Sequence, residues 1–188
     1  MDHTLKVSRC LVVAHPDDEV IWFAPEYFNL IVIVFLGRED KPWMDPCRKK
    51  SLFEHDLGDK ILCLNLIESG FWKDASRSKE HRSAYAKTQR ELKAIFNRSS
   101  FNEIYTHGPE GEYGHSDHTL VHQVVKKVLR PDQMMYYPVS HTSRLFDLVH
   151  KSDTVLRKRI MQVYKMNKCW TWNEDHIFNE EIKYRAIK

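Results

Sequence analysis

Two short polar segments of the chain carry the residue types that hydrolytic chemistry requires. Residues 14–19 read Ala-His-Pro-Asp-Asp-Glu, and residues 114–118 read Gly-His-Ser-Asp-His. Histidine nitrogens and carboxylate oxygens are ligands of catalytic Zn²⁺, where three protein donors leave a fourth position for water. Zinc lowers the pKa of that water from about 15.7 to about 7. A spare carboxylate can then accept the water's proton, and a spare histidine can donate a proton to a departing amine or stabilise an oxyanion.

Each segment also has a plainer interpretation when it is taken alone. The His-Pro-Asp part of residues 14–19 could form only a turn and a helix N-cap, and the acids that follow suit the positive end of a helix dipole. His118 and His122 lie four residues apart, as in a two-histidine helical zinc motif, but either could be solvated or bonded internally. His107 could line the same site or belong to an ordinary loop. The positions of the two segments in the predicted fold favour the metal-hydrolase interpretation.

Apolar runs and turn signals predict alternating strands and helices. The predicted strands cover residues 10–14, 30–36, 60–64, 103–106 and 133–139. The predicted helices run from Asp17 or Asp18 to about Phe28, from Asp45 to Gly58, over residues 81–96, from Ser116 or Asp117 to Leu129, and over residues 153–165. The last twenty residues show no clear pattern. This alternation predicts an α/β fold with a largely parallel sheet.

The predicted topology explains how two segments far apart in the chain could form one site. Residues 14–19 follow the first predicted strand, and residues 114–118 open the helix after the fourth. Ligands of open α/β sheets bind beyond the carboxyl ends of the strands, where the strand order reverses. If strands one and four are neighbours, as in a doubly wound sheet, we expect the two segments to meet there.

Together, the two segments resemble the motifs of the PIG-L (LmbE-like) deacetylases, which are zinc-dependent enzymes that remove acetyl groups from N-acetylglucosamine-type substrates. The resemblance covers residues 8–140 and includes Gly-Glu-Tyr-Gly-His-Ser-Asp-His at residues 111–118, with a weaker match at residues 48–58. It implies a Rossmann-like three-layer sandwich with a mostly parallel central sheet, and a single deacetylase domain over residues 1–188.

By position, the resemblance makes His15, Asp18 and His118 the zinc ligands. It makes Asp17 the general base and His115 the residue that assists the leaving amine or the oxyanion. On these roles we expect activity to be bell-shaped with pH.

Three further residues complete the site that the resemblance implies, and the position of a fourth in the sequence suggests that it belongs to the same site. Asp117 would orient His115 and raise the pKa of its ring, and Tyr113 would stabilise the tetrahedral intermediate or set the basic limb of the pH profile. Arg48 would contact substrate. Arg38 follows the second predicted strand, where it could bind sugar hydroxyls or a phosphate, or belong to a solvated loop. The chain departs from the family in having Ser51 where an acid follows the arginine, in the bulky residues 21–25, and in its shorter length.

Composition narrows the classes of partner. The 188 residues include 29 basic and 26 acidic side chains spread along the chain, so we expect no nucleic-acid partner. The longest apolar run has seven residues, where a bilayer span needs about 20, and no secretory signal is recognisable. The four cysteines form no Cys-x-x-Cys pair, which favours free thiols in a reduced, cytoplasmic protein.

The function expected from the sequence is therefore zinc-dependent removal of the N-acetyl group from a small amino-sugar compound, with release of acetate. One alternative is a metal amidase that acts on another N-acyl conjugate. Another is a catalytically weak module that binds a sugar or a nucleotide. Asp17 argues against pure binding, because a binding module needs no base beside the metal.

Overall fold

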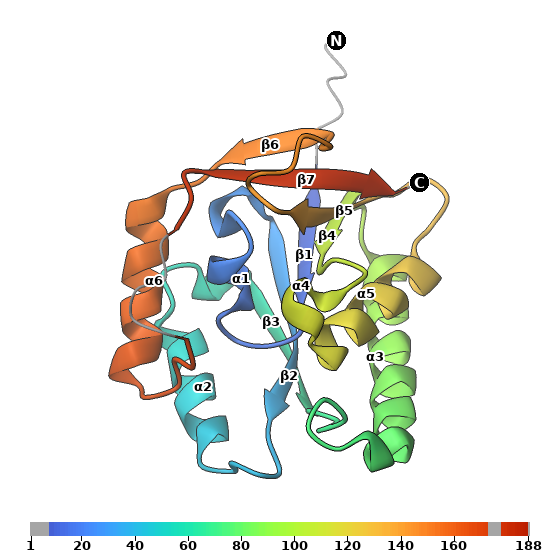
Figure 1. The fold of residues 1–188 in the computed structure, drawn as a ribbon, viewed down its shortest axis with the longest axis vertical. Coiled ribbons are helices and arrows are strands. Elements are labelled where there is room, and N and C mark those ends of the chain that lie inside the picture. Colours follow the sequence, from blue (N-terminus) through green and yellow to red (C-terminus); the bar gives the residue numbers. More distant parts are fainter. Residues whose placement is uncertain (1–7, 173–177, 188) are drawn as a thin grey trace.

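The computed structural model describes residues 8–172 and 178–187, which form one seven-stranded sheet with helices on both sides (Figure 1). The strands are β1 (Arg9–Val13), β2 (Leu30–Gly37), β3 (Ile61–Ile67), β4 (Glu103–Thr106), β5 (Met134–Val139), β6 (Leu148–Lys151) and β7 (Glu181–Ile187). The α-helices are α1 (Asp18–Ile21), α2 (Met44–Glu54), α3 (Ser78–Arg98), α4 (Gly111–Gly114), α5 (Ser116–Val128) and α6 (Thr154–Met166). Three short 3₁₀ turns cover Pro25–Tyr27, Gly58–Lys60 and Ala75–Arg77.

The strand order confirms the predicted meeting point of the two polar segments. The sheet runs β3-β2-β1-β4-β5-β7-β6, and the first five strands in this order are parallel. β1 pairs with β4 from Arg9↔Glu103 to Val12↔Thr106, so the order reverses between these two strands. The loops after β1 and β4 consequently open side by side at one edge of the sheet.

Alternation along β1 explains the three layers. Leu11 and Val13 belong to one core cluster, to which α1 and α6 also contribute, whereas Cys10 and Val12 belong to a second cluster with residues of α3 and α5. Figure 1 shows α1, α2 and α6 on one side of the sheet and α3 and α5 on the other. The Rossmann-like sandwich expected from the motifs is confirmed, and its two cores hold β1 and its terminal loop in place.

One expectation about the elements is wrong, and one segment without a predicted element contains a strand. The first helix ends at Ile21 instead of Phe28, and Pro25 begins a separate 3₁₀ turn. Proline disfavours helical geometry in the residue before it, and Ala24 accordingly has φ −99° and ψ 86°. The unassigned C-terminal part contains β7, which pairs antiparallel with β5 and β6. Its alternating buried Ile182 and Tyr184 are the period-two signal that would have revealed it.

The other predicted elements are present with shifted ends. All four cysteines are free, in line with the expected thiols. None of the helices in the described ranges has the length and apolar character to cross a membrane.

Candidate metal centre and active site

The loop after β1 positions His15, Asp17 and Asp18 by an abrupt turn. Asp17 has φ 99° and ψ −26°, a left-handed conformation that non-glycine residues rarely adopt, and α1 begins at the next residue. The backbone N–H of His15 donates to Asp18 Oδ2 at 2.8 Å, which closes the turn. All three side chains are buried. The turn therefore concentrates one histidine and two carboxyl groups at the end of β1.

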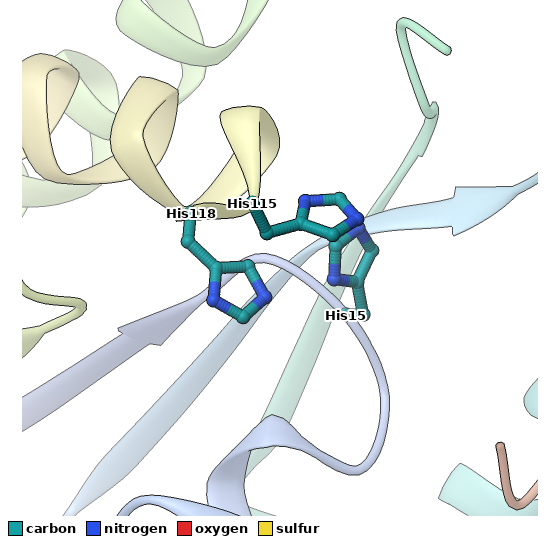
Figure 2. Close-up of side chains that lie close together, drawn as sticks. All are labelled: His15, His115 and His118. Carbon is teal, nitrogen blue, oxygen red and sulfur yellow. The ribbon is translucent and has the colours of Figure 1, made fainter. Parts of the chain in front are cut away.

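The start of α5 brings two further histidines to the same point. Figure 2 shows His115 and His118 extending from the beginning of α5 toward His15, and one ring nitrogen from each of the three lies within 4.8 Å of the others. Asp18 joins the group, because its Oδ2 lies 3.3 Å from His15 Nδ1 and its Oδ1 lies 3.3 Å from His118 Nε2. The structure thus brings together the three predicted zinc ligands.

His118 has the arrangement of a metal-binding histidine. Its Nδ1 lies 2.6 Å from Glu112 Oε2, whereas its Nε2 is buried and has no hydrogen-bond partner among the described residues. An unpaired buried ring nitrogen is costly, and metal-bound histidines usually donate their other N–H to a carboxylate. The donor set and the unpaired Nε2 beside Asp18 therefore fit a zinc ion.

Glu112 is a site residue that the sequence reasoning missed. Besides His118, its Oε2 lies 2.9 Å from His107 Nδ1, and its Oε1 accepts the Gly108 N–H at 2.8 Å. Glu112 has φ 55° between Gly111 and Gly114, both also at positive φ. The two glycines of the motif were the available signal, because they mark a tight turn that could direct a side chain inward.

His107 and His122 stabilise the neighbourhood of the site through internal hydrogen bonds. The His107 ring stacks on His118 at 3.8 Å, and its Nε2 accepts the Ala14 N–H at 2.9 Å. Donor atoms of Asp18, His107 and His118 also lie within 4.8 Å, but the Ala14 N–H occupies the His107 lone pair that a metal would need. His122 Nδ1 donates to the backbone oxygen of His107 at 2.7 Å.

Two cavities of similar size open near this edge of the sheet. The one of about 460 Å³ is lined by His15, Asp17, Asp18, Arg38, Lys41, Arg48, Glu68, Trp72, Lys73, Tyr113, Gly114, His115, Thr171 and Trp172. The other, of about 500 Å³, reaches Trp22 and Glu112 but contains none of the predicted site residues. We call the first cavity the active-site cleft, because it contains the groups capable of chemistry.

Asp17 has the surroundings of a proton acceptor. Burial raises the pKa of its carboxyl well above the usual value, and the neighbouring Asp18 adds to the rise. Thr171 Oγ1 lies 3.4 Å from Asp17 Oδ2. A carboxyl group whose pKa is shifted toward neutrality is a better general base than an ordinary aspartate.

The contacts of Asp117 differ from the sequence expectation. Its Oδ2 lies 3.4 Å from His15 Nε2, and its Oδ1 accepts the Ser69 hydroxyl at 2.8 Å. Only its backbone N–H reaches His115, donating to Nδ1 at 3.2 Å, so that His115 is the N-cap of α5. Because Asp117 lies in the first turn of α5, its backbone N–H faces the His115 ring at the N-cap. Its side chain instead reaches His15 at the end of β1.

His115 is neutral in this arrangement. Burial, followed by the nearby His15 and His118, lowers its pKa to about 3, contrary to the rise expected from Asp117. Since Nδ1 accepts the Asp117 N–H, the proton of the neutral ring is on Nε2. His115 can therefore donate one hydrogen bond without being charged.

Tyr113 lies at the mouth of the active-site cleft. Its side chain is about half exposed and stacks on Trp22, with ring centroids 6.1 Å apart, and its ring centroid is 5.7 Å from that of His115. Partial burial and nearby carboxylates raise the pKa of its hydroxyl. The hydroxyl accordingly stays protonated and can donate.

Arg48 and Arg38 both line the cleft, and both meet Glu68, which sequence reasoning also missed. Arg48 is buried and donates from Nη1 to Glu68 Oε1 at 2.7 Å, while Arg38 Nε lies 3.6 Å from Glu68 Oε2. Ser51 instead donates to the backbone oxygen of Cys47 at 3.0 Å. The acid that the sequence lacks at position 51 is thus replaced by one from the end of β3.

Comparison with known proteins confirms the resemblance found in the motifs. No protein-family model matches the chain. A 1D-myo-inositol 2-acetamido-2-deoxy-alpha-D-glucopyranoside deacetylase of Corynebacterium diphtheriae is 29% identical over 147 residues, 62% of this chain and 50% of the relative. The chain thus spans about half the length of that relative. An uncharacterized protein of Acanthamoeba polyphaga mimivirus is 21% identical over 95% of this chain and 77% of its own.

Solved structures share the fold. One is the deacetylase-bog complex of a deacetylase in the biosynthesis pathway of teicoplanin. Its TM-score is 0.66 at 12% identity, and the match covers 95% of this chain and 97% of the other. The zinc-inhibited form of teicoplanin deacetylase has a TM-score of 0.62 at 12% identity, covering 96% and 99%. These likenesses confirm the three-layer architecture.

Proposed function

We propose that this protein is a zinc-dependent hydrolase that removes the N-acetyl group from an N-acetylglucosamine-type amino-sugar compound and releases acetate. The observation that carries the proposal is the buried Nε2 of His118, which makes no hydrogen bond to any described residue. It lies 3.3 Å from Asp18 Oδ1 and next to the cleft that contains Asp17. The named deacetylase among the relatives supports the reaction type.

His15, Asp18 and His118 would hold the metal. Glu112 behind His118 and Asp117 behind His15 would fix the orientation of the two rings and increase their basicity. Bound there, zinc would supply Lewis-acid chemistry for activating water and polarising the amide carbonyl. The protein would act as a single domain over residues 1–188.

Asp17 would move the protons of the reaction. Its carboxylate takes a proton from the attacking water as the oxygen adds to the carbonyl carbon. The carbon–nitrogen bond then breaks, and the proton passes to the nitrogen, because an amide anion is too poor a leaving group. The second proton of the water also passes from the new carboxyl group to the amine nitrogen, so the products are acetate and the protonated amine, and atoms and charges balance.

His115 and Tyr113 would stabilise the negative charge that develops on the carbonyl oxygen. The neutral His115 ring donates from Nε2, and the Tyr113 hydroxyl stays protonated beside it. Because the pKa of His115 is low, the oxyanion role suits it better than protonating the amine. Arg38 and Arg48 would contact the substrate at the far side of the cleft.

The cellular setting is also a proposal. Four free thiols, two of them buried, are typical of a protein in a reducing compartment, which supports the cytoplasm.

Metal analysis of the purified protein combined with acetate release from N-acetylglucosamine derivatives tests the function. We expect one zinc per chain and zinc-dependent acetate release. Turnover of other N-acyl conjugates without acetate release would favour the broader amidase. Zinc-loaded protein that binds sugars without turning over any N-acyl compound would refute the hydrolase.

A further inference from the structure

The active-site cleft contains more positive charge than the proposed chemistry uses. Its basic lining residues are Arg38, Lys41, Arg48 and Lys73, and its acidic ones are Asp17, Asp18 and Glu68. In the proposed function Asp18 is a metal ligand and Asp17 handles protons, while Glu68 is paired with Arg48 at 2.7 Å. Arg38, Lys41 and Lys73 therefore need another explanation.

One carboxylate serves two of these three cations. Asp40 accepts from Arg38 Nη2 at 3.0 Å and from Arg38 Nε at 3.1 Å, and it also pairs with Lys73. Lys41 has no ion pair with any residue in the described ranges. Arg38 shares Glu68 with Arg48, so the four cations of the cleft face two carboxylates outside the metal centre, Asp40 and Glu68, which leaves two uncompensated positive charges among the described residues. Arg38 still has the N–H groups of Nη1 to offer, since its hydrogen bonds to described residues use Nε and Nη2.

A shared carboxylate connects these charges to the metal centre. Arg38 and Lys41 follow β2, and Lys73 follows β3, whereas the metal ligands come from the ends of β1 and β4. Glu68 Oε1 lies 3.8 Å from His15 Nε2, and Glu68 Oε2 lies 3.6 Å from Arg38 Nε. Arg38 is therefore close enough to contact a substituent of a sugar whose amide lies at His15.

Trp72 lies between the metal centre and the charges. Its ring centroid is 5.1 Å from that of His115, and Lys73 Nζ lies 4.8 Å from the Trp72 centroid. An aromatic ring beside the reacting group gives an amphipathic sugar a surface to pack against. The cleft thus continues from metal donors to an aromatic surface and then to cations.

We propose that the amino sugar carries an anionic group, a phosphate or a carboxylate, at its anomeric carbon, which is bonded to the carbon that bears the amide. The inference rests on the proposed deacetylase function, which places the amide at His15, Asp18 and His118. Charge-assisted hydrogen bonds from Arg38, Lys41 and Lys73 would hold this group in place. The amide would then be held at a fixed position relative to the metal ligands. A neutral sugar would desolvate these cations without compensation.

The test compares three substrates. Two are anionic: N-acetylglucosamine 1-phosphate and the carboxymethyl glycoside of N-acetylglucosamine. The third, the methyl glycoside of N-acetylglucosamine, is uncharged. We expect kcat/KM for at least one anionic substrate to exceed that for the methyl glycoside by about tenfold or more, the equivalent of one charge-assisted hydrogen bond. The preference should shrink at high salt, and the better anion identifies the group.

Variants locate the preference. Lys41→Gln combined with Lys73→Gln should reduce the ratio of anionic to neutral kcat/KM by about tenfold. Lys50→Gln is the matched control, because Lys50 is an exposed lysine of α2 paired with Glu54 outside the cleft. The ratio should not change in this control.

Binding of the amine products provides a readout that needs no turnover. Calorimetry should show tighter binding of glucosamine 1-phosphate than of methyl glucosaminide to metal-free protein, and the double variant should lose this difference. Equal use and equal binding of charged and neutral compounds would overturn the inference while leaving the deacetylase intact. A preference that survives in the double variant would also overturn it, because the anion would then be bound elsewhere. Acetate release from none of the substrates would instead refute the proposed function.

Discussion

Glu19 Oε2 accepts a hydrogen bond from the backbone N–H of Asp17 at 3.0 Å and so holds the proposed base in its left-handed conformation. Glu19 is fully buried, and its other oxygen accepts the Tyr164 hydroxyl at 2.6 Å and lies 3.2 Å from His55 Nε2. Unfavourable backbone conformations persist where the surroundings over-determine them. Tyr164 of α6 and His55 after α2 therefore position Asp17 through Glu19.

We predict that Tyr164→Phe lowers kcat severalfold, with little change in KM or zinc content, because Glu19 loses its shortest hydrogen bond and holds Asp17 less firmly. Steady-state kinetics and metal analysis measure this split. Tyr184→Phe is the matched control, since Tyr184 is an equally buried tyrosine whose hydroxyl accepts from the Ala24 N–H at 3.4 Å. Equal losses of kcat in both variants would show only a general effect of removing a buried hydroxyl.

Asp17→Asn should reduce turnover by roughly 10²–10⁴, the usual contribution of acid–base catalysis, because the amide keeps the shape but cannot accept the proton. Zinc content should stay that of the wild type. Loss of zinc would instead make Asp17 a ligand and exchange its role with that of Asp18.

His118→Ala should remove zinc and activity together, whereas His122→Ala should keep the metal, because His122 bonds only the backbone of His107 among the described contacts. Glu112→Gln should weaken zinc binding by roughly 10–100-fold through the lost carboxylate on His118. Zinc titration of the three variants checks this order. Metal loss in His122→Ala alone would contradict the assignment.

The pH profile should have an acidic limb set by Asp17 and no basic limb from His115. Asp17 must be ionised to accept a proton, and its pKa is raised, so activity falls as pH drops through that value. His115, with a pKa of about 3, stays neutral throughout the working range. His115→Ala should lower kcat more than KM, retain zinc and leave the shape of the pH profile unchanged. A basic limb that disappears in this variant would show that a charged His115 takes part.

Local sequence was sufficient for the elements whose signal lies within one segment. The continuous apolar runs predicted β1 and β2, and the polar residues directly after β1 and at the start of α5 predicted the site. Strand order could also be anticipated, because parallel strands joined by helices follow the doubly wound pattern that makes β1 and β4 neighbours. The end of α1 was harder to predict, because the apolar pattern continues past Ile21 while Pro25 forces the residue before it out of helical geometry.

The sequence by itself determined which groups are available for chemistry and at which edge of the sheet they gather, since both follow from residue type and strand ends. Only the tertiary structure decided their partners: Glu112 for His118, Glu68 for Arg48, and Asp117 for His15 instead of His115. Glu68 comes from a different strand end than Arg38, and no spacing rule relates Glu68 to Arg48. The direction of the Asp117 carboxylate depends on how α5 packs against β1, which a one-dimensional pattern does not contain.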